Sequence, residues 1–296
     1  MGDWVLSIEG TEAGSRAAMI LALVAAVAHA TLGALQKGRF DPWLSRGAID
    51  LCAAAMAIPL ALFVVPLPGP ELIVLFPAMM LIHLAYKWVL AMAYSRGDFT
   101  AVYPVVRGTG PLATVVIAGF VFGEHFTPGQ WAGVALLSGG IFALGAYNLR
   151  KALGDLGRLW AALLLAVLTG LITALYTVYD AYAIRLAADP FTFIVWFFLL
   201  EGILFPALLL PRWRQAADLG HLFRRGIFGA LIAYVSFGAV FLATRLDKVG
   251  EAAALRETSV IFAAILGWLL LGERVGPVRA AIMVLIALGA VMIEFA

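Results

Sequence analysis

Long apolar stretches recur along the whole chain, and each is close to the length that a helix needs to cross a lipid bilayer. Such a helix takes about 20 residues at a rise of about 1.5 Å per residue. Proline, glycine and clustered charges mark the breaks between the stretches. These breaks predict ten spans, at residues 17–36, 47–66, 72–94, 99–122, 129–148, 160–184, 191–210, 226–244, 250–271 and 277–295.

The composition places these helices in a bilayer. Of the 296 residues, 64% are hydrophobic and only 13% are charged. A soluble domain has about 45–50% apolar and roughly 25% charged residues. A soluble fold could not bury that much apolar surface beneath so little polar surface. The sequence therefore predicts an all-α integral membrane protein with ten transmembrane helices.

Several other classes of protein are disfavoured. The formal net charge is only +2 and no basic patch is present, so we expect no nucleic-acid partner. The single cysteine, Cys52, cannot form an intrachain disulfide. Residues 1–15 lack the positive start of a cleavable signal peptide. Because HExxH, GxSxG, P-loop and paired Cys/His motifs are absent from the sequence, we expect no enzyme, metal or cofactor.

The two halves of the chain match when they are shifted by 149 positions, without a gap. Apolar matches between alanine- and leucine-rich segments carry little weight, but scarce charged and turn residues also coincide. The matched pairs are Arg96 with Arg245, Asp98 with Asp247, Arg107 with Arg256, Gly123-Glu124 with Gly272-Glu273, and Pro128 with Pro277. We interpret the match as an internal duplication of five spans.

Because five is odd, the second copy must enter the membrane in the opposite orientation. The predicted parts are a polar N-terminal segment (1–16), a first five-helix repeat (17–148), a linker (149–159) and a second five-helix repeat (160–296). Inverted repeats are common in secondary transporters, whose site lies near the midplane between the halves. We therefore expect two inverted repeats around a central cavity.

Lysine and arginine are divided unevenly between the two membrane faces that these spans define. Four lie on the face of the N-terminus and 13 on the opposite face. The positive-inside rule then places both termini on the non-cytoplasmic side.

Three cations remain inside the predicted spans: Lys87, Arg107 and Arg256. A charge at the bilayer centre costs about 2.5–3.5 kcal/mol on insertion scales. Because both arginines lie near a helix start, two interpretations stay open. Either they line a polar interior, or they reach the interface and pair with carboxylates such as Asp98 or Glu251. Arg256 also has a carboxylate as its immediate neighbour in the sequence.

Lys87 lies deep in its span, four residues after His83, so the two share one helix face with Tyr86 beside them. We interpret this face as lining the cavity; a buried lysine paired to a carboxylate or to carbonyls is the alternative. Asp180 and Glu201 lie deep in two other spans. Either acid is a candidate proton site or the partner of Lys87.

Tyrosines inside the spans complete the predicted cavity. Tyr176 and Tyr179 are three apart, a spacing that suits a face holding an amphipathic molecule. Pro104, next to Tyr103, removes a backbone donor and can free a carbonyl there. The predicted cavity residues are His83, Tyr86, Lys87, Tyr103, Arg107, Tyr176, Tyr179, Asp180, Tyr234, Ser236 and Arg256.

A Gly-Glu pair follows the fourth and the ninth predicted spans. The glycine is expected to end the helix, and a carboxylate at that end does not complement the helix dipole. We therefore expect each glutamate to cap or pin the tight turn into the next span. Two GxxxG motifs, at 119/123 and 129/133, predict close helix packing.

The stretches "GFVFGEHFTPGQWAG" and "GWLLLGERVGPVRAA", with the spans around them, resemble the end-of-repeat signature of the drug/metabolite transporter superfamily, specifically its ten-span EamA-type members. The resemblance covers essentially the whole chain through the two-repeat layout. Within that group the aromatic-rich spans look most like YddG-type exporters of aromatic amino acids and cationic drugs.

The resemblance implies a secondary active transporter in a bacterial inner (plasma) membrane. It would export small amphipathic metabolites, such as amino acids or related amines and drugs, by alternating access. The alternatives are a channel or facilitator of the same fold, and a membrane-embedded enzyme or lipid-handling protein. Expected partners are a small-molecule substrate and the lipid bilayer, and proton coupling stays open. Fused repeats allow a monomer, because the pairing surface already lies within one chain.

Overall fold

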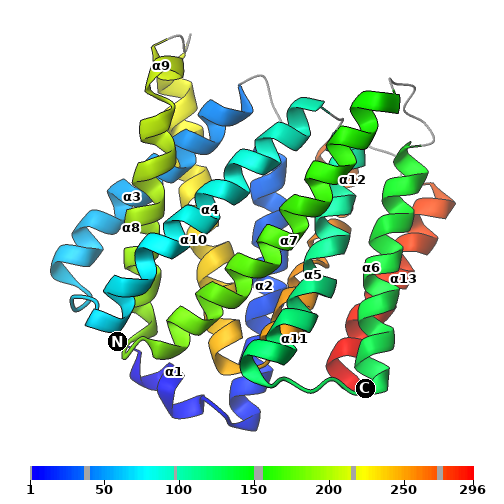
Figure 1. Ribbon diagram of the computed structural model, residues 1–296, viewed down its shortest axis with the longest axis horizontal. Helices are drawn as coiled ribbons and strands as arrows, with labels where there is room; N and C mark the ends of the chain where they lie inside the picture. The colour runs from blue at the N-terminus through cyan, green and yellow to red at the C-terminus, as the bar shows by residue number, and fades with distance from the viewer. Residues whose placement is uncertain (1, 37–40, 97–98, 150–155, 215–217, 272–275) are drawn as a thin grey trace. The chain divides into compact units, whose positions relative to one another are not determined.

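The computed structural model describes residues 2–36, 41–96, 99–149, 156–214, 218–271 and 276–296 (Figure 1). Every element of regular secondary structure in these ranges is a helix. Nine of the described helices are long and apolar enough to cross a bilayer. This confirms the prediction of an all-α integral membrane protein.

Each of these nine helices corresponds to one predicted span. They are α2 (Glu12–Gln36), α3 (Pro42–Phe63), α4 (Pro70–Arg96), α5 (Phe99–Phe122), α6 (Pro128–Leu149), α7 (Leu156–Leu186), α8 (Pro190–Leu208), α10 (Leu219–Leu246) and α13 (Pro277–Phe295). Two short helices without a predicted counterpart are α1 (Asp3–Ile8) and α9 (Leu210–Trp213).

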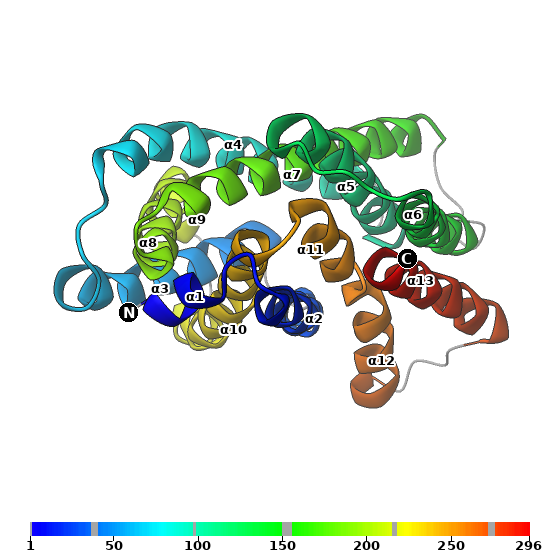
Figure 2. The ribbon, with the colours of Figure 1, turned by 90° about the horizontal axis from the view of Figure 1, so that it is seen from below.

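The predicted ninth span, residues 250–271, is not one helix. It is divided into α11 (Val249–Arg256) and α12 (Ser259–Leu271), which Figure 2 shows as separate coils. Glu257 and Thr258 form the break. The Thr258 hydroxyl donates to the Leu255 carbonyl oxygen at 2.7 Å. A side chain that bonds the nearby backbone competes with the helical ladder, so the prediction of a continuous span was wrong here. The arrangement of ten helices in two inverted repeats stays a prediction.

Polar and special residues set several helix ends. Pro190 is the first residue of α8, where a missing N–H costs no helical hydrogen bond. Asp189 caps the same end by accepting from the Phe191 N–H at 3.0 Å. Gly123, directly after α5, has φ of 67°, a left-handed conformation that glycine adopts without strain. This confirms the predicted helix end at the first Gly-Glu pair.

Large apolar side chains project outward from the helices. Phe63, Val74 and Phe120 are 84%, 76% and 87% exposed, respectively. Such side chains suit contact with lipid acyl chains, which supports a bilayer as the surrounding medium.

The chain forms two compact units. The first unit comprises Met1–Leu84 and Tyr179–Asp247, and the second comprises Ala85–Val178 and Lys248–Ala296. The helices α4 and α7 each begin in one unit and end in the other. Each unit therefore contains helices from both halves of the sequence. The compact units and the predicted repeats are different divisions of the chain, and the repeat boundaries stay a prediction.

In the first unit, α10 packs against α2 and α3, and α3 packs against α8. Glycine permits the close approach of α10 to α3. A β-carbon added at Gly226 would lie 2.9 Å from the Ala48 carbonyl oxygen, and one at Gly229 would lie 2.5 Å from the Ile49 side chain. The first unit is thus held by small residues where its helices cross, as is typical of membrane proteins.

In the first unit, one arginine at the end of α7 and one at the end of α10 each bind carbonyl oxygens of the other helix. Arg185, at the end of α7, donates to the carbonyl oxygens of Thr244 (3.0 Å) and Asp247 (2.7 Å) at the end of α10. Arg245, at the end of α10, donates in return to Ala187 at 2.8 Å and also to Ile184. Each cation therefore binds the last carbonyls of the other helix, where the helix dipole favours positive charge.

In the second unit, α6 and α13 pack side by side (Figures 1 and 2). A β-carbon at Gly140 would lie 2.7 Å from the Ile286 side chain, and one at Gly289 would lie 2.6 Å from the Leu137 backbone nitrogen. Gly140 and Gly289 are 149 positions apart, and so are Leu137 and Ile286. The two contacts are reciprocal, as contacts across a two-fold axis are.

Candidate functional site

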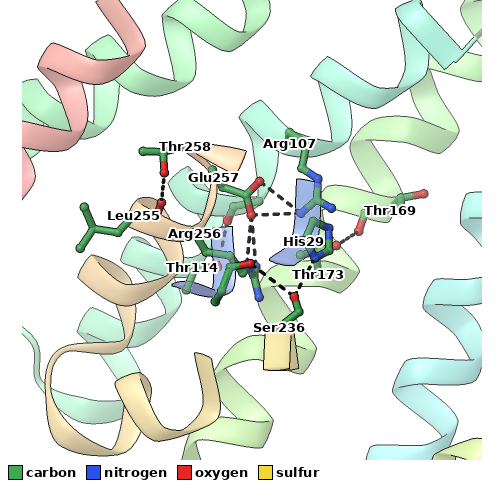
Figure 3. Close-up of polar contacts among 12 residues, drawn as sticks. His29, Arg107, Thr114, Thr169, Thr173, Ser236, Leu255, Arg256, Glu257 and Thr258 are labelled. Carbon is green, nitrogen blue, oxygen red and sulfur yellow. Dashed lines mark hydrogen bonds and ion pairs between the residues drawn. The ribbon is translucent and has the colours of Figure 1, made fainter. Parts of the chain in front are cut away.

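The second unit contains a buried cluster of two arginines and one glutamate, called here the arginine cluster: Arg107, Arg256 and Glu257. The Arg107 Nη1 lies 3.2 Å from both carboxylate oxygens of Glu257. The Arg256 Nε and Nη2 lie 3.3 and 3.2 Å from Glu257 Oε1. Figure 3 shows the carboxylate with Arg107 on one side and Arg256 on the other. The three side chains are at most 7% exposed.

The break between α11 and α12 places the carboxylate of this cluster. Arg256 is the last residue of α11, and Glu257 follows it in the break. The Glu257 N–H donates to the Ala254 carbonyl oxygen at 3.0 Å, which tightens the last turn. The chain resumes a helix only at Ser259, so Glu257 lies between the C-terminus of one helix and the N-terminus of the next.

Arg107 has a partner that the sequence analysis did not assign to it. Arg107 pairs with Glu257, whereas Glu251 binds Lys248 at 2.8 Å and Gln130 at 2.7 Å. Asp98 lies outside the described residues. Arg107 and Glu257 are 150 positions apart, and only the fold brings them together.

The glutamate of the first Gly-Glu pair also acts at a distance. Glu124 accepts hydrogen bonds from the backbone N–H groups of Val249 (2.6 Å) and Gly250 (3.1 Å), the first two residues of α11. A helix N-terminus is a favourable partner for a carboxylate. That Glu124 also pins the turn into its own next helix stays a prediction. The equivalent Glu273 lies outside the described residues. Glu124 therefore holds the start of the helix whose other end carries Arg256.

Three of the predicted cavity tyrosines lie in the second unit near the arginine cluster. The Tyr103 ring lies 5.2 Å from the guanidinium carbon of Arg107, a cation–π distance. Tyr86 and Tyr176 form an edge-to-face pair with ring centroids 5.1 Å apart. Tyr176 also interacts electrostatically with all three members of the cluster. Charged and aromatic groups are thus combined in one part of the second unit, and the role of these residues in a cavity stays a prediction.

Hydroxyl groups of the second unit divide into two kinds. Thr114, Thr169 and Thr173 each donate to the carbonyl oxygen four residues earlier in their own helix, and Figure 3 shows where they lie. Ser259 is fully buried, yet its hydroxyl makes no hydrogen bond to any described residue. A buried hydroxyl in that state retains its hydrogen-bonding capacity for another group.

The first unit contains a second buried group, called here the histidine cluster: His83, Asp180 and Glu201. His83 Nε2 lies 2.8 Å from Asp180 Oδ2, and His83 Nδ1 lies 3.9 Å from Glu201 Oε2. The ring also makes an edge contact with Phe197 at 5.1 Å. All three cluster residues are at most 7% exposed. The two acids proposed as proton sites are therefore joined by a histidine, which the sequence analysis had placed only beside Lys87.

Lys87 is 6% exposed and lies one turn beyond His83 on α4, as the spacing predicted. The remaining predicted cavity residues belong to the first unit. The Tyr179 and Tyr234 hydroxyls donate to the carbonyl oxygens of Leu75 and Ala53, each at 3.0 Å. Ser236 lies 3.4 Å from His29 Nδ1. In this structure the two tyrosines connect helices, and their contact with substrate stays a prediction.

Comparison with known proteins gives evidence on the family of the chain that does not depend on the contacts described above. Residues 160–295 match the sequence profile of the EamA-like transporter family. The match covers the second predicted repeat, which is similar to the members of that family. The match confirms the resemblance to EamA-type drug/metabolite transporters, while the narrower YddG-like identity stays a prediction.

Structural comparison supports the fold over nearly the whole chain. A solved structure described only as "Crystal structure of protein" matches with a TM-score of 0.75 at 19% sequence identity, covering 94% of this chain and 98% of that chain. At this identity the likeness concerns the fold alone. No curated protein sequence matches the chain. The EamA-like segment thus belongs to a multi-pass membrane protein with a fold already seen in a crystal.

Proposed function

We propose that the chain is a secondary active transporter that exports small amphipathic metabolites, such as amino acids or related amines and drugs, by alternating access. The observation that carries this proposal is the pair of buried charge clusters on helices that cross the membrane. Ionisable groups inside a membrane are costly, and they usually mark substrate or ion pathways. The match to the EamA-like transporter family supports the same function.

The broken helix adds a second argument. Transporters commonly build their sites from discontinuous helices, whose interrupted backbone and helix ends contact the substrate or its ions. Here the break carries Glu257 and is bordered by Arg256 and Ser259. Tyr86, Tyr103 and Tyr176 would contact the apolar body of the substrate, since aromatic side chains offer both an apolar face and a polar edge.

The histidine cluster is the proposed proton site. A neutral imidazole has one N–H and one lone pair, so it can donate to only one of two carboxylates. The imidazole and the two carboxyl groups lie close together, and each is of a type that can hold or pass a proton. The charged groups facing His83 are Asp180 from α7 and Glu201 from α8, with Lys87 one turn farther along α4. We propose that protonation of this cluster accompanies transport.

Counterflow in liposomes tests the transport proposal. Purified protein is reconstituted in liposomes loaded with unlabelled amino acids, and labelled phenylalanine, tryptophan, threonine and lysine are added outside. A carrier accumulates label transiently through exchange, and protein-free liposomes provide the control. Flux without saturation or counterflow would support a channel instead, and a product of changed mass would support an enzyme. Absence of both exchange and binding across the panel would exclude the amino-acid version.

A further inference from the structure

The charges of the arginine cluster do not cancel. Two guanidinium groups, each permanently protonated, share the single carboxylate of Glu257, so the three side chains together carry one positive charge. All three are buried. Burying a charge that its neighbours do not balance opposes folding. The cluster therefore has a strong electrostatic preference for one more anion.

The contacts that Glu257 makes with the two arginines are also those of a carboxylate that another carboxylate could replace. The strongest arginine–carboxylate pairing has two parallel N–H···O bonds of about 2.7–2.9 Å. Arg107 instead uses one nitrogen for both oxygens, and Arg256 uses two nitrogens for one oxygen, all at 3.2–3.3 Å. These four contacts with Glu257 are longer than those of the strongest pairing. An external carboxylate could therefore improve on the contacts that Glu257 makes.

The surroundings of the cluster suit the same kind of ligand. Glu257 lies at the N-terminal side of α12, where backbone N–H groups favour negative charge. The buried Ser259 hydroxyl, which has no hydrogen bond to any described residue, is a further donor two residues away. Tyr103 lies against Arg107, and the Tyr86–Tyr176 pair supplies apolar ring surface. The chemistry fits a carboxylate with an apolar or aromatic body.

The repeat relationship explains how one carboxylate came to serve two arginines. Arg107 and Arg256 are equivalent positions of the two halves, but the residue after Arg107 is Gly108, where the second half has Glu257. One half therefore supplies a cation without the neighbouring acid. Two arginines at equivalent positions thus bind one glutamate, which only the second half supplies.

We infer that Arg107 and Arg256 bind the carboxylate of an organic monoanion, and that Glu257 is an internal counter-ion which that carboxylate displaces. Substrate binding then exchanges one carboxylate for another at the break between α11 and α12. The inference rests on the proposed transport function, and it names the charged end of the substrate and the three residues that select it.

Ligand-induced thermal stabilisation of the purified, detergent-solubilised protein tests the inference without measuring transport. The probes are benzoate, benzylamine and benzyl alcohol, which share one ring and differ in charge. We expect benzoate alone to raise the Tm of the wild-type protein. Glu257→Gln should lower the Tm, because two arginines lose their carboxylate, and benzoate should restore it with an affinity at least tenfold above that for the wild type.

Glu251→Gln is the matched control, because it removes a different glutamate–cation pair of the same unit. Benzoate should stabilise it no more than it stabilises the wild type. Arg107→Gln leaves only the neutral Arg256–Glu257 pair and should lose the benzoate response, which keeps the test decisive if Glu257→Gln does not fold. Equal responses to benzoate and benzyl alcohol, an unaltered response in Arg107→Gln, or equal rescue of Glu257→Gln and Glu251→Gln would each overturn the inference.

The binding test and the counterflow test fail separately. Charge-selective benzoate binding without exchange of any labelled amino acid would refute the amino-acid version of the transport proposal and leave the anion site intact. Exchange with no dependence on Arg107 or Glu257 would refute the anion site and leave the transporter intact.

Discussion

The close packing of α6 and α13 predicts that replacing Gly139 and Gly289 by alanine changes the free energy of unfolding in opposite directions. Gly139 and Gly140 are adjacent on α6, but a β-carbon on Gly139 would meet nothing within 4 Å, whereas one on Gly140 would lie 2.7 Å from Ile286. The reciprocal Gly289 is more constrained still. Its β-carbon would lie 2.6 Å from the Leu137 backbone nitrogen and 2.8 Å from the Gly133 carbonyl oxygen.

These distances give the expected changes in the free energy of unfolding. Replacing an unconstrained helical glycine by alanine stabilises by about 0.5–1 kcal/mol, which is the expectation for Gly139→Ala. Overpacking costs about 1–3 kcal/mol. For Gly289→Ala the clash involves backbone that cannot rotate away, so we expect net destabilisation of roughly 1–2 kcal/mol. Gly140→Ala should fall between them, because the Ile286 side chain can adjust.

Equilibrium unfolding of the purified protein in mixed micelles measures all three variants under the same conditions. The order of stability should be Gly139→Ala above the wild type, and Gly289→Ala below both. If Gly289→Ala were as stable as Gly139→Ala, α6 and α13 could not approach as closely as the structure places them. The reciprocal contact between the two halves would then be wrong as well.

Three further predictions concern charged residues. Arg245→Met should lower the free energy of unfolding by about 1–3 kcal/mol, because buried carbonyl oxygens lose their donor. The control is Arg96→Met, at the exposed position that matches Arg245 in the predicted repeat, and it should change this free energy by less than about 0.5 kcal/mol. Equal changes in the two variants would contradict the role of Arg245 in binding the last carbonyls of α7. Glu124→Gln should destabilise by about 0.5–2 kcal/mol in the same unfolding assay, because α11 loses the charged cap at its start. Asp180→Asn should change the pH dependence of transport, because it removes a carboxylate that lies 2.8 Å from His83. An unchanged profile in a counterflow assay would remove the histidine cluster from coupling.

The sequence could predict the membrane helices because their cause is local. Length, apolar composition and breaker residues decide where a chain can cross a bilayer, and nine predicted spans have their counterparts in the structure. Proline after an aspartate, as at Asp189-Pro190, sets a helix start through groups only one or two residues apart. Features of this kind need no knowledge of the rest of the fold.

The interruption between α11 and α12 has a different cause. The run Arg256-Glu257-Thr258 is short, and its apolar flanks have the length of a full span, so the average hydropathy hides it. Glu257 is stabilised at the break by Arg107, a residue 150 positions away. Charged and hydroxylated residues in succession inside a span were the available signal, and the fold adds a long-range ion pair that the sequence could not show.

The same separation limits how far site residues can be assigned from sequence. Arg107, Arg256, Asp180 and Glu201 were recognised because charges are costly inside a membrane. Apart from Glu257 beside Arg256, their partners were not recognised, since a partner is usually a property of packing between helices that are distant in the chain. His83 illustrates this point: spacing linked it to Lys87 on one helix, and the fold added Asp180 from another.

The position after each repeated arginine now has a physical meaning. If the two halves were identical there, two glutamates would neutralise two arginines, and the cluster would have no preference for a further anion. If both halves had glycine, two buried arginines would face each other without a carboxylate, which would oppose folding. The combination of Gly108 with Glu257 lies between these limits, because it balances enough charge for the helices to pack and leaves one positive charge to be satisfied. Under the proposed duplication and the proposed anion site, a single asymmetric position would be enough to create a charged binding site, and that position lies at the break between α11 and α12.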